Sequence, residues 1–281
     1  YYLSDHQTWP EQLRTCLQPG IPRLWLNNAG LDGHTTFGHA MLFDQYLAEL
    51  RPKCLVFLIG ANDVGRDHSA GVDDRLKRDQ GTRNPLARFY FWIVEHSSVM
   101  ALCDNLRRTS QARIAGVHHQ DINHGELKWN ETQGPHHTDE QIREILQMHR
   151  SRFLAGYQHR IEALLERCRD HQVMPVLMTQ PALFGPGIDP ETGVDLSRVA
   201  VGDHRGGLQW QILELYNDVT RQVARDKRVT LIDLAHDMPH DSRFYYDYYH
   251  FTNAGAAQVA QIVSEPLQQA LRMQFPELSQ P

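Results

Sequence analysis

A continuous apolar run at residues 54–59 constrains the fold of this chain more than any other stretch. The run is too short to cross a membrane as a helix, and it lacks the alternation of a strand with one wet face. Such runs are typical of strands buried on both faces of a parallel sheet. Residues 173–179 and 229–233 predict two further strands, and residues 23–27 predict a shorter one.

Segments with helical spacing of apolar residues separate these predicted strands. The first begins at Thr8, with proline in its first turn and a glutamate three residues after the threonine, and runs to about Leu17. Four more are predicted, at residues 37–50, 138–168, 208–223 and 252–273. Because strands alternate with helices, we predict an α/β fold: a parallel sheet with helices on both faces, in a single domain of residues 1–281.

Residues 66–138 interrupt the alternation. This stretch holds a charged segment, two predicted helices at residues 85–96 and 98–108, and a polar segment at residues 116–137. A long loop without secondary structure is unusual inside a compact domain. We therefore interpret residues 66–138 as a helical and loop insertion that lies over one end of the sheet.

The composition excludes several classes of partner. With 41% apolar residues, 22% charged residues and a net charge of -6, the chain has no basic surface for nucleic acid. No window approaches the roughly 18 apolar residues of a membrane span. We expect neither a nucleic-acid partner nor a membrane span in this chain. The four cysteines lack C-x-x-C spacing, which leaves disulfide bonds open: Cys16, Cys54, Cys103 and Cys168.

Polar loops follow three of the predicted strands: residues 28–36, residues 60–63 and residues 233–250. Ligands of open parallel sheets bind at the carboxyl ends of the strands, so we expect these loops to meet at one edge. The Asn62 amide could donate a hydrogen bond to a developing oxyanion there. Gly30 could present an unshielded backbone N–H to the same point.

The third loop carries a carboxylate three residues before an imidazole, in Asp247-Tyr248-Tyr249-His250. A carboxylate beside a histidine can fix its tautomer and stabilise the imidazolium that forms when it accepts a proton. Histidine suits general base catalysis near neutral pH. Taken alone, the pair is equally typical of a loop histidine bonded to a local carboxylate.

Together these blocks resemble the SGNH (GDSL-like) hydrolases over nearly the whole chain, in both order and spacing. The matching positions are Asn28-x-Gly30, Gly60-x-Asn62-Asp63 and Asp247-x-x-His250, and residues 8–10 and 178–181 are similar as well. The resemblance implies a three-layer α/β/α sandwich with a flavodoxin-like parallel sheet, and serine ester chemistry. It makes His250 the base, Asp247 its orienting acid, and Gly30 and Asn62 the oxyanion hole. Asn28, Gly60 and Asp63 would support them.

One block of the family pattern is missing. The family's nucleophilic serine lies in a Gly-Asp-Ser-like block at the end of the first strand, shortly before the helix that begins here at Thr8. This chain contains no such block, and Ser4, the nearest serine, follows no glycine-rich strand end. We expect the first strand and its serine to lie upstream of Tyr1, and we assign the nucleophile to no residue of the chain.

The resemblance therefore predicts a serine esterase or acylhydrolase that cleaves a short-chain or acetyl ester, carried by a carbohydrate or another small molecule, without a cofactor. The alternatives are a polysaccharide O-acyltransferase and an inactive carbohydrate-binding pseudo-hydrolase. Aromatic residues around the last motif could stack on sugar rings, although packing of the loop onto the sheet is the favoured interpretation: Phe244, Tyr245, Tyr246, Tyr248 and Tyr249.

A metal site is a further rival, because histidines and carboxylates gather in one polar stretch: His118, His119, Asp121, His124, Glu126, His136 and His137. The stretch has no i, i+4 histidine pair and no H-E-x-x-H motif, so we expect no metal. A run of acidic residues near the predicted site is interpreted as a solvated surface: Asp63, Asp67, Asp73 and Asp74.

Overall fold

Three parallel strands form the centre of the molecule. The computed structural model describes residues 3, 5–73, 85–114 and 133–279. In it β1 (Cys54–Leu58), β2 (Met174–Met178) and β5 (Thr230–Ile232) pair in the order β1-β2-β5. Leu58 lies opposite Met178, and Met178 opposite Ile232, so the carboxyl ends of all three strands are level. The predicted parallel sheet is confirmed for these strands.

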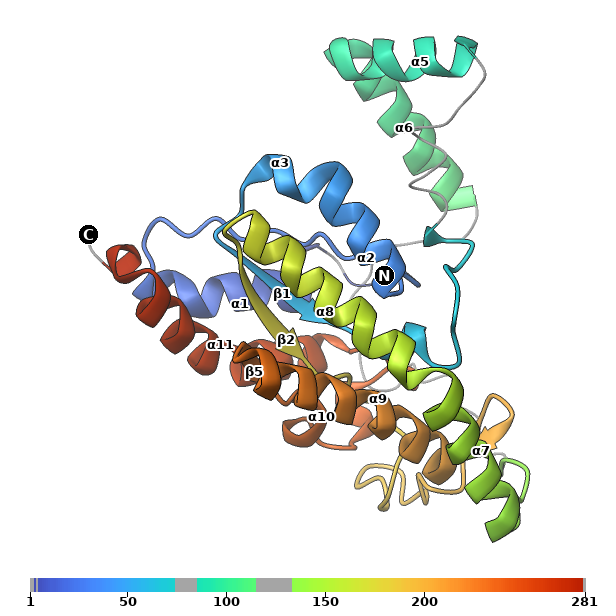
Figure 1. The fold of residues 1–281 in the computed structure, drawn as a ribbon. Coiled ribbons are helices and arrows are strands. Elements are labelled where there is room, and N and C mark those ends of the chain that lie inside the picture. The colour runs from blue at the N-terminus through green and yellow to red at the C-terminus, as the bar shows by residue number, and fades with distance from the viewer. Residues whose placement is uncertain (1–2, 4, 74–84, 115–132, 280–281) are drawn as a thin grey trace.

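Helices cover both faces of the sheet (Figure 1). On one face α1 (Trp9–Leu17) and α11 (Asn253–Gln274) pack together and share an apolar cluster with Val176 and Met178. On the other face α8 (Leu154–Asp170) and α9 (Gly206–Lys227) share a second cluster with Leu177. Because neighbouring residues of a strand point to opposite faces, the apolar run of β2 supplies both clusters. The arrangement confirms the α/β/α layers.

The remaining elements are shorter. Residues 36–50 form one helical stretch of α2 (Thr36–Leu42), a π-helical segment (Phe43–Leu47) and α3 (Ala48–Leu50). A two-stranded hairpin, β3 (Ala200–Val201) with β4 (His204–Arg205), lies in the loop after β2. The turn of α10 (Leu234–Asp237) follows β5. No described helix is long and apolar enough to cross a membrane.

Two predictions about single elements are wrong. Residues 23–27 form no strand, although Leu24 and Leu26 pack on the core while Trp25 stays 66% exposed. Their alternation is that of a strand, but no described strand pairs with their backbone groups. The predicted helix at residues 138–168 is two helices, α7 (Asp139–Arg152) and α8, which meet at a kink where φ of Phe153 is -109° although its backbone hydrogen bonds to His149 and Tyr157 remain.

The insertion contains both predicted helices, α5 (Pro85–His96) and α6 (Ser98–Ile114). They pack against each other and project away from the sheet, instead of lying over its end (Figure 1). The second helix also runs further than the predicted residue 108.

Candidate active site

The loops that follow the three strands meet at the carboxyl edge of the sheet. The Thr179 hydroxyl, just after β2, donates to Asp233 Oδ1 after β5 at 2.8 Å. The Leu183 N–H donates to the Tyr248 carbonyl at 2.9 Å and ties the second loop to the third. Gly60, after β1, lies against Gln180, where a Cβ on the glycine would be 3.5 Å away. The loops predicted to meet were those at residues 28–36, 60–63 and 233–250, whereas these contacts join the first and third strand ends through the loop after β2.

A small apolar cluster lies beneath the meeting point. Its buried members come from the loop after β2, the β3–β4 hairpin and α9: Ala182, Phe184, Val199, Val201 and Leu213. Ala61 from the first loop and Tyr248 and Tyr249 from the third loop pack onto this cluster. The residues beside Asn62 and those beside His250 therefore share one support.

Asp247 and His250 form a complete acid–imidazole pair. Asp247 Oδ1 accepts the backbone N–H groups of Tyr249 and His250, both at 2.8 Å, and Oδ2 accepts His250 Nδ1–H at 2.7 Å. The Tyr246 ring stacks on the imidazole, with centroids 5.5 Å apart and planes within 10°. The carboxylate holds Nδ1, which leaves Nε2 as the nitrogen that can accept a proton.

The electrostatics of the pair keep the carboxylate charged. Burial raises the pKa of Asp247, but the hydrogen bond and charge of His250 and the two backbone donors outweigh it, so the pKa lies below the ordinary value. The His250 side chain is 48% exposed. An ionised acid behind a solvent-accessible imidazole is the arrangement that a general base requires.

The loop after β1 is built around Gly60 and Asn62. Gly60 has φ at 135°, a conformation that favours glycine and lets the strand turn sharply. The Asn62 amide donates to the His34 carbonyl at 3.0 Å and so joins this loop to residues 28–36. An amide nitrogen carries two hydrogens, so one donor of Asn62 remains for another acceptor.

The Asn28–Gly30 segment is an exposed turn closed on itself. The Gly30 N–H donates to Asn28 Oδ1 at 2.9 Å, the geometry of an Asx turn. This N–H is therefore already hydrogen-bonded, and its role as an oxyanion donor stays a prediction.

The predicted acidic surface is wrong for two of its four members. Asp63 and Asp73 are only 1% and 0% exposed. Asp73 accepts the Thr35 N–H at 3.1 Å and the Thr35 hydroxyl at 2.8 Å, and Asp63 accepts the Thr36 hydroxyl at 2.6 Å. Both carboxylates are buried because they replace water with donors from residues 35–36. Asp67 is partly exposed, and Asp74 lies outside the described residues.

Arg160 of α8 completes this support and was not found from the sequence. Its Nε donates to the Thr36 hydroxyl at 2.7 Å, and its Nη2 lies 3.3 Å from Asp63 Oδ1. Burial raises the pKa of Asp63, and the Thr36 and Arg160 contacts oppose that rise without cancelling it. No motif marks an arginine that contacts an aspartate nearly a hundred residues away.

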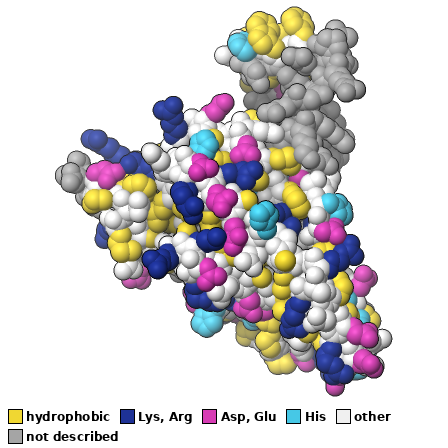
Figure 2. Space-filling model, viewed as in Figure 1, with side chains coloured by type: hydrophobic (Ala, Val, Ile, Leu, Met, Phe, Trp, Pro, Cys, Tyr) yellow, Lys and Arg dark blue, Asp and Glu magenta, His cyan; other side chains and the backbone are white. Residues whose placement is uncertain are grey.

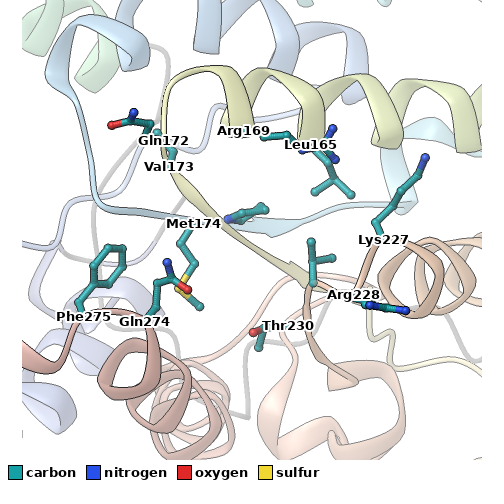
Figure 3. A pocket seen from close by; sticks show the side chains of 12 residues that line it. Leu165, Arg169, Gln172, Val173, Met174, Lys227, Arg228, Thr230, Gln274 and Phe275 are labelled. Atoms are coloured by element: carbon teal, nitrogen blue, oxygen red, sulfur yellow. The ribbon is translucent and has the colours of Figure 1, made fainter.

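Two cavities lie at opposite ends of the sheet. The larger, about 410 Å³, opens at the amino ends of β2 and β5 between Arg169, Lys227 and Phe275 (Figure 3). A second cavity of about 340 Å³ adjoins the acid–imidazole pair through Tyr249. It is lined also by the β3–β4 turn and α9: Val201, Gly202, Asp203, His204 and Gln209. Of these two cavities, only the second is lined by a residue next to His250 in the sequence, Tyr249.

The rival metal site falls largely outside the described residues, which exclude His118, His119, Asp121, His124 and Glu126. Within the described part of the chain, no group of three or more histidines, cysteines or carboxylates could hold a metal ion. All four cysteines are free, and burial raises the pKa of Cys54 and of Cys168 to about 12.

Comparison with known proteins identifies the family to which the chain belongs. The model of the GDSL-like Lipase/Acylhydrolase family matches residues 2–258. This chain belongs to the GDSL-like lipase/acylhydrolase family. The resemblance seen in the sequence is confirmed, and the chain is an ester hydrolase of this family.

Several solved structures are similar to the chain at low identity. An acetyl xylan esterase, AlAXEase, is 15% identical, with 92% of this chain and 89% of that chain covered and a TM-score of 0.45. An Axe2 variant, an acetylxylan esterase from Geobacillus stearothermophilus, is 12% identical over 92% and 80%, with a TM-score of 0.48. LAE5, an alpha/beta hydrolase from the metagenome of Lake Arreo, is 14% identical over 94% and 81%, with a TM-score of 0.46. A search of curated protein sequences gives no match.

Proposed function

We propose that this family member is a serine esterase that cleaves a short-chain ester, such as an acetyl ester on a carbohydrate, with Asp247 and His250 as acid and base. The 2.7 Å contact between Asp247 Oδ2 and His250 Nδ1, at the carboxyl edge of a parallel sheet, carries the proposal. The cavity beside Tyr249 supports a small substrate. Its polar lining by Asp203, His204 and Gln209 suits the hydroxyl groups of a sugar.

The mechanism follows from the atoms of this pair. His250 Nε2 removes the proton of a serine hydroxyl as the oxygen attacks the ester carbonyl, and the charged Asp247 stabilises the imidazolium. The imidazolium then gives its proton to the departing alcohol. Water attacks the acyl-enzyme by the same route and releases the acid. No serine of this chain lies in the family's nucleophile block, so the proposal assigns the attacking serine to no residue of the chain.

Attack on the ester turns its carbonyl oxygen into an oxyanion. Hydrogen-bond donors that already point at this position stabilise the transition state. Asn62 contributes the amide hydrogen that it does not give to His34. Gly30 contributes its backbone N–H only when the Asn28 side chain releases it, because one N–H cannot serve both acceptors well. Binding of the substrate thus includes a local change in the Asn28–Gly30 turn.

The experiment compares two histidine–aspartate pairs in the full-length protein. With p-nitrophenyl acetate, His250→Ala should lower kcat by about 10²–10⁴-fold, the usual contribution of a general base. His236→Ala is the matched control, since His236 contacts Asp237 at 2.9 Å but is 80% exposed on α10. The control should keep full activity. Unchanged hydrolysis by the His250 variant would exclude the assignment.

A second assay separates hydrolysis from acyl transfer. Acetate release from an acetylated oligosaccharide is measured with and without an added sugar acceptor. We expect release to water in both cases. Preferential transfer to the sugar would favour an O-acyltransferase, and binding without turnover would favour an inactive carbohydrate-binding protein.

A further inference from the structure

Arg160 is a charged residue of α8 that lies inside the molecule. Figure 2 shows basic and acidic side chains intermingled on the face over α8 and α9. Arg167, further along α8, is of this solvated kind, since its side chain is 35% exposed and pairs with Asp44, which is 51% exposed. The Arg160 side chain is only 12% exposed, and that of its partner Asp63 only 1%. A buried charge loses its hydration, so its contacts must replace what water supplied.

The Arg160 guanidinium contacts two segments of the candidate site at once. Toward the start of α2, its Nε donates to the Thr36 hydroxyl at 2.7 Å. Toward the loop after β1, its Nη2 donates to Asp63 Oδ1 at 3.3 Å and to the Arg66 carbonyl at 3.5 Å. The guanidinium carbon lies over the Phe37 ring, 4.4 Å from its centroid. One rigid, planar group therefore connects two segments that are far apart in the sequence.

The same two segments meet at the Asn62 amide. Asp63, the next residue, accepts the Thr36 N–H at 3.2 Å and the Thr36 hydroxyl at 2.6 Å. Asn62 Nδ2 donates to the His34 carbonyl at 3.0 Å. These contacts join the same pair of segments, and Arg160 touches both members of the first. The direction of the remaining Asn62 N–H therefore depends on how the two segments lie relative to each other.

We propose that Arg160 is a positioning residue of the esterase: it acts through Asp63 and Thr36 to hold the Asn62 amide where the oxyanion forms. The inference rests on the proposed function, because it takes Asn62 as an oxyanion donor. Such a donor is effective only if it already points at the developing charge. A planar guanidinium with several fixed donors can hold two segments at one separation, which contacts within a single loop cannot do.

Arg160→Lys in the full-length protein is the most informative variant. Lysine keeps the positive charge beside the buried Asp63 carboxylate, so we expect the protein to fold. A single ammonium group cannot donate to both Thr36 and Asp63 with the fork of an arginine, nor lie as a plane on Phe37. We expect kcat for p-nitrophenyl acetate to fall by about 10–10²-fold, because a misplacement of about 1 Å can cost the larger factor. KM should stay unchanged, since the contact that is lost forms only in the transition state.

Arg167→Lys is the matched control, because it makes the same change on the same helix at a partly exposed ion pair. It should keep full activity. A cycle with Asn62→Ala, with rates normalised to the folded fraction, separates positioning from a general loss of structure. Once the Asn62 amide is gone, Arg160→Lys should lower kcat no further. An equal loss with and without Asn62 would overturn the proposal.

A second measurement separates this inference from the proposed function. In isotope-labelled protein, NMR observes the two side-chain amide protons of Asn62 directly. We expect Arg160→Lys to shift these signals and to speed their exchange with water, and Arg167→Lys to leave them unchanged. If the wild type hydrolyses no ester but the signals respond in this way, the proposed function fails while Arg160 still positions Asn62. Signals that do not respond to Arg160→Lys would refute the positioning role, whatever the activity.

Discussion

Buried polar residues hold the loops of the candidate site in place. His34 supplies the carbonyl that binds Asn62, and the next two residues, Thr35 and Thr36, bind the carboxylates of Asp73 and Asp63. Space around Asp73 is tight, since a Cβ on Gly38 would lie 2.2 Å from its Oδ1. The loop at residues 34–36 is thus fixed from several sides, which keeps the Asn62 amide oriented before substrate arrives.

His39 beside this network should make the fold sensitive to acid. Burial lowers the pKa of His39 from 6.5 to about 4, and the neighbouring His34 adds to this, while Asp73 acts in the opposite direction. The unfolded chain binds the proton near pH 6.5 and the folded chain only near pH 4. Stability is therefore lost as pH falls through this window, by up to about 3 kcal/mol.

Denaturant unfolding of the wild type and of His39→Gln, at pH 7 and pH 4.5, measures this contribution. The wild type should lose more of its free energy of unfolding than the variant does. Other buried histidines titrate in both proteins, so the difference between them isolates His39. The same pH dependence in both would show that His39 is not the cause.

At single residues, local spacing decided what the sequence could predict. Asp247 and His250 are three residues apart, so their contact follows from one loop. Arg160 and Asp63 meet only because α8 packs beside the loop after β1, which no local pattern encodes. Asp63 and Asp73 were predicted to lie on the surface because their hydrogen-bond donors are distant in the sequence. These donors, on the loop of residues 35–36, compensate for the loss of water when the carboxylates are buried.

Among the elements, the start of α11 controls the position of the acid–imidazole pair. Thr252 accepts the Gly255 N–H at 3.1 Å as a helix cap and donates to the Arg243 carbonyl at 2.6 Å. Gly255 lies so close to the preceding loop that a Cβ there would approach the Phe244 carbonyl oxygen to 1.9 Å. The helix and the loop that carries His250 are therefore in direct backbone contact.

Gly255→Ala should push the start of α11 away from the Phe244 backbone. The methyl group cannot fit without a shift of the Phe244 backbone, which we expect to cost about 1–3 kcal/mol. Esterase activity should fall with it, since the shift moves the loop of residues 244–250. Gly71→Ala is the matched control, because a Cβ on Gly71 meets nothing within 4 Å. Thermal unfolding and esterase activity are measured for both variants. If Gly255→Ala kept the same melting temperature and activity as Gly71→Ala, the contact between Gly255 and Phe244 would not position the loop.

Strands were predicted correctly where an apolar sequence pattern coincided with a neighbouring strand that could pair with it. The runs at residues 54–59, 173–179 and 229–233 contain the strands of the sheet, and each of these strands pairs with a parallel neighbour. Residues 23–27 have the alternation of a strand but no described strand beside them, and a strand exists only through such pairing. A sequence pattern shows which side chains turn inward, but not whether a backbone partner is present.

For the whole molecule, the site depends on an apolar cluster that belongs to neither face of the sheet. The clusters around α11 and around α8 close the two faces, whereas the Phe184 cluster lies under the loops at the carboxyl edge. The Phe184 ring is fully buried and contacts the rings of Tyr248 and Tyr249, with centroids 5.9 Å and 5.2 Å away. It therefore supports the chain immediately before His250.

Phe184→Ala should consequently affect stability and activity together. Loss of a buried phenylalanine costs about 3–5 kcal/mol, and the cavity lets Tyr248 and Tyr249 move together with the loop that carries His250. A displacement of even 1 Å can lower turnover by about 10²-fold. Leu267→Ala, in the α1–α11 cluster and only 2% exposed, should cost about 2–5 kcal/mol while leaving kcat/KM per folded molecule unchanged. Activity normalised to the folded fraction distinguishes the two variants, and an equal loss in both would mean that the Phe184 cluster does not position the site.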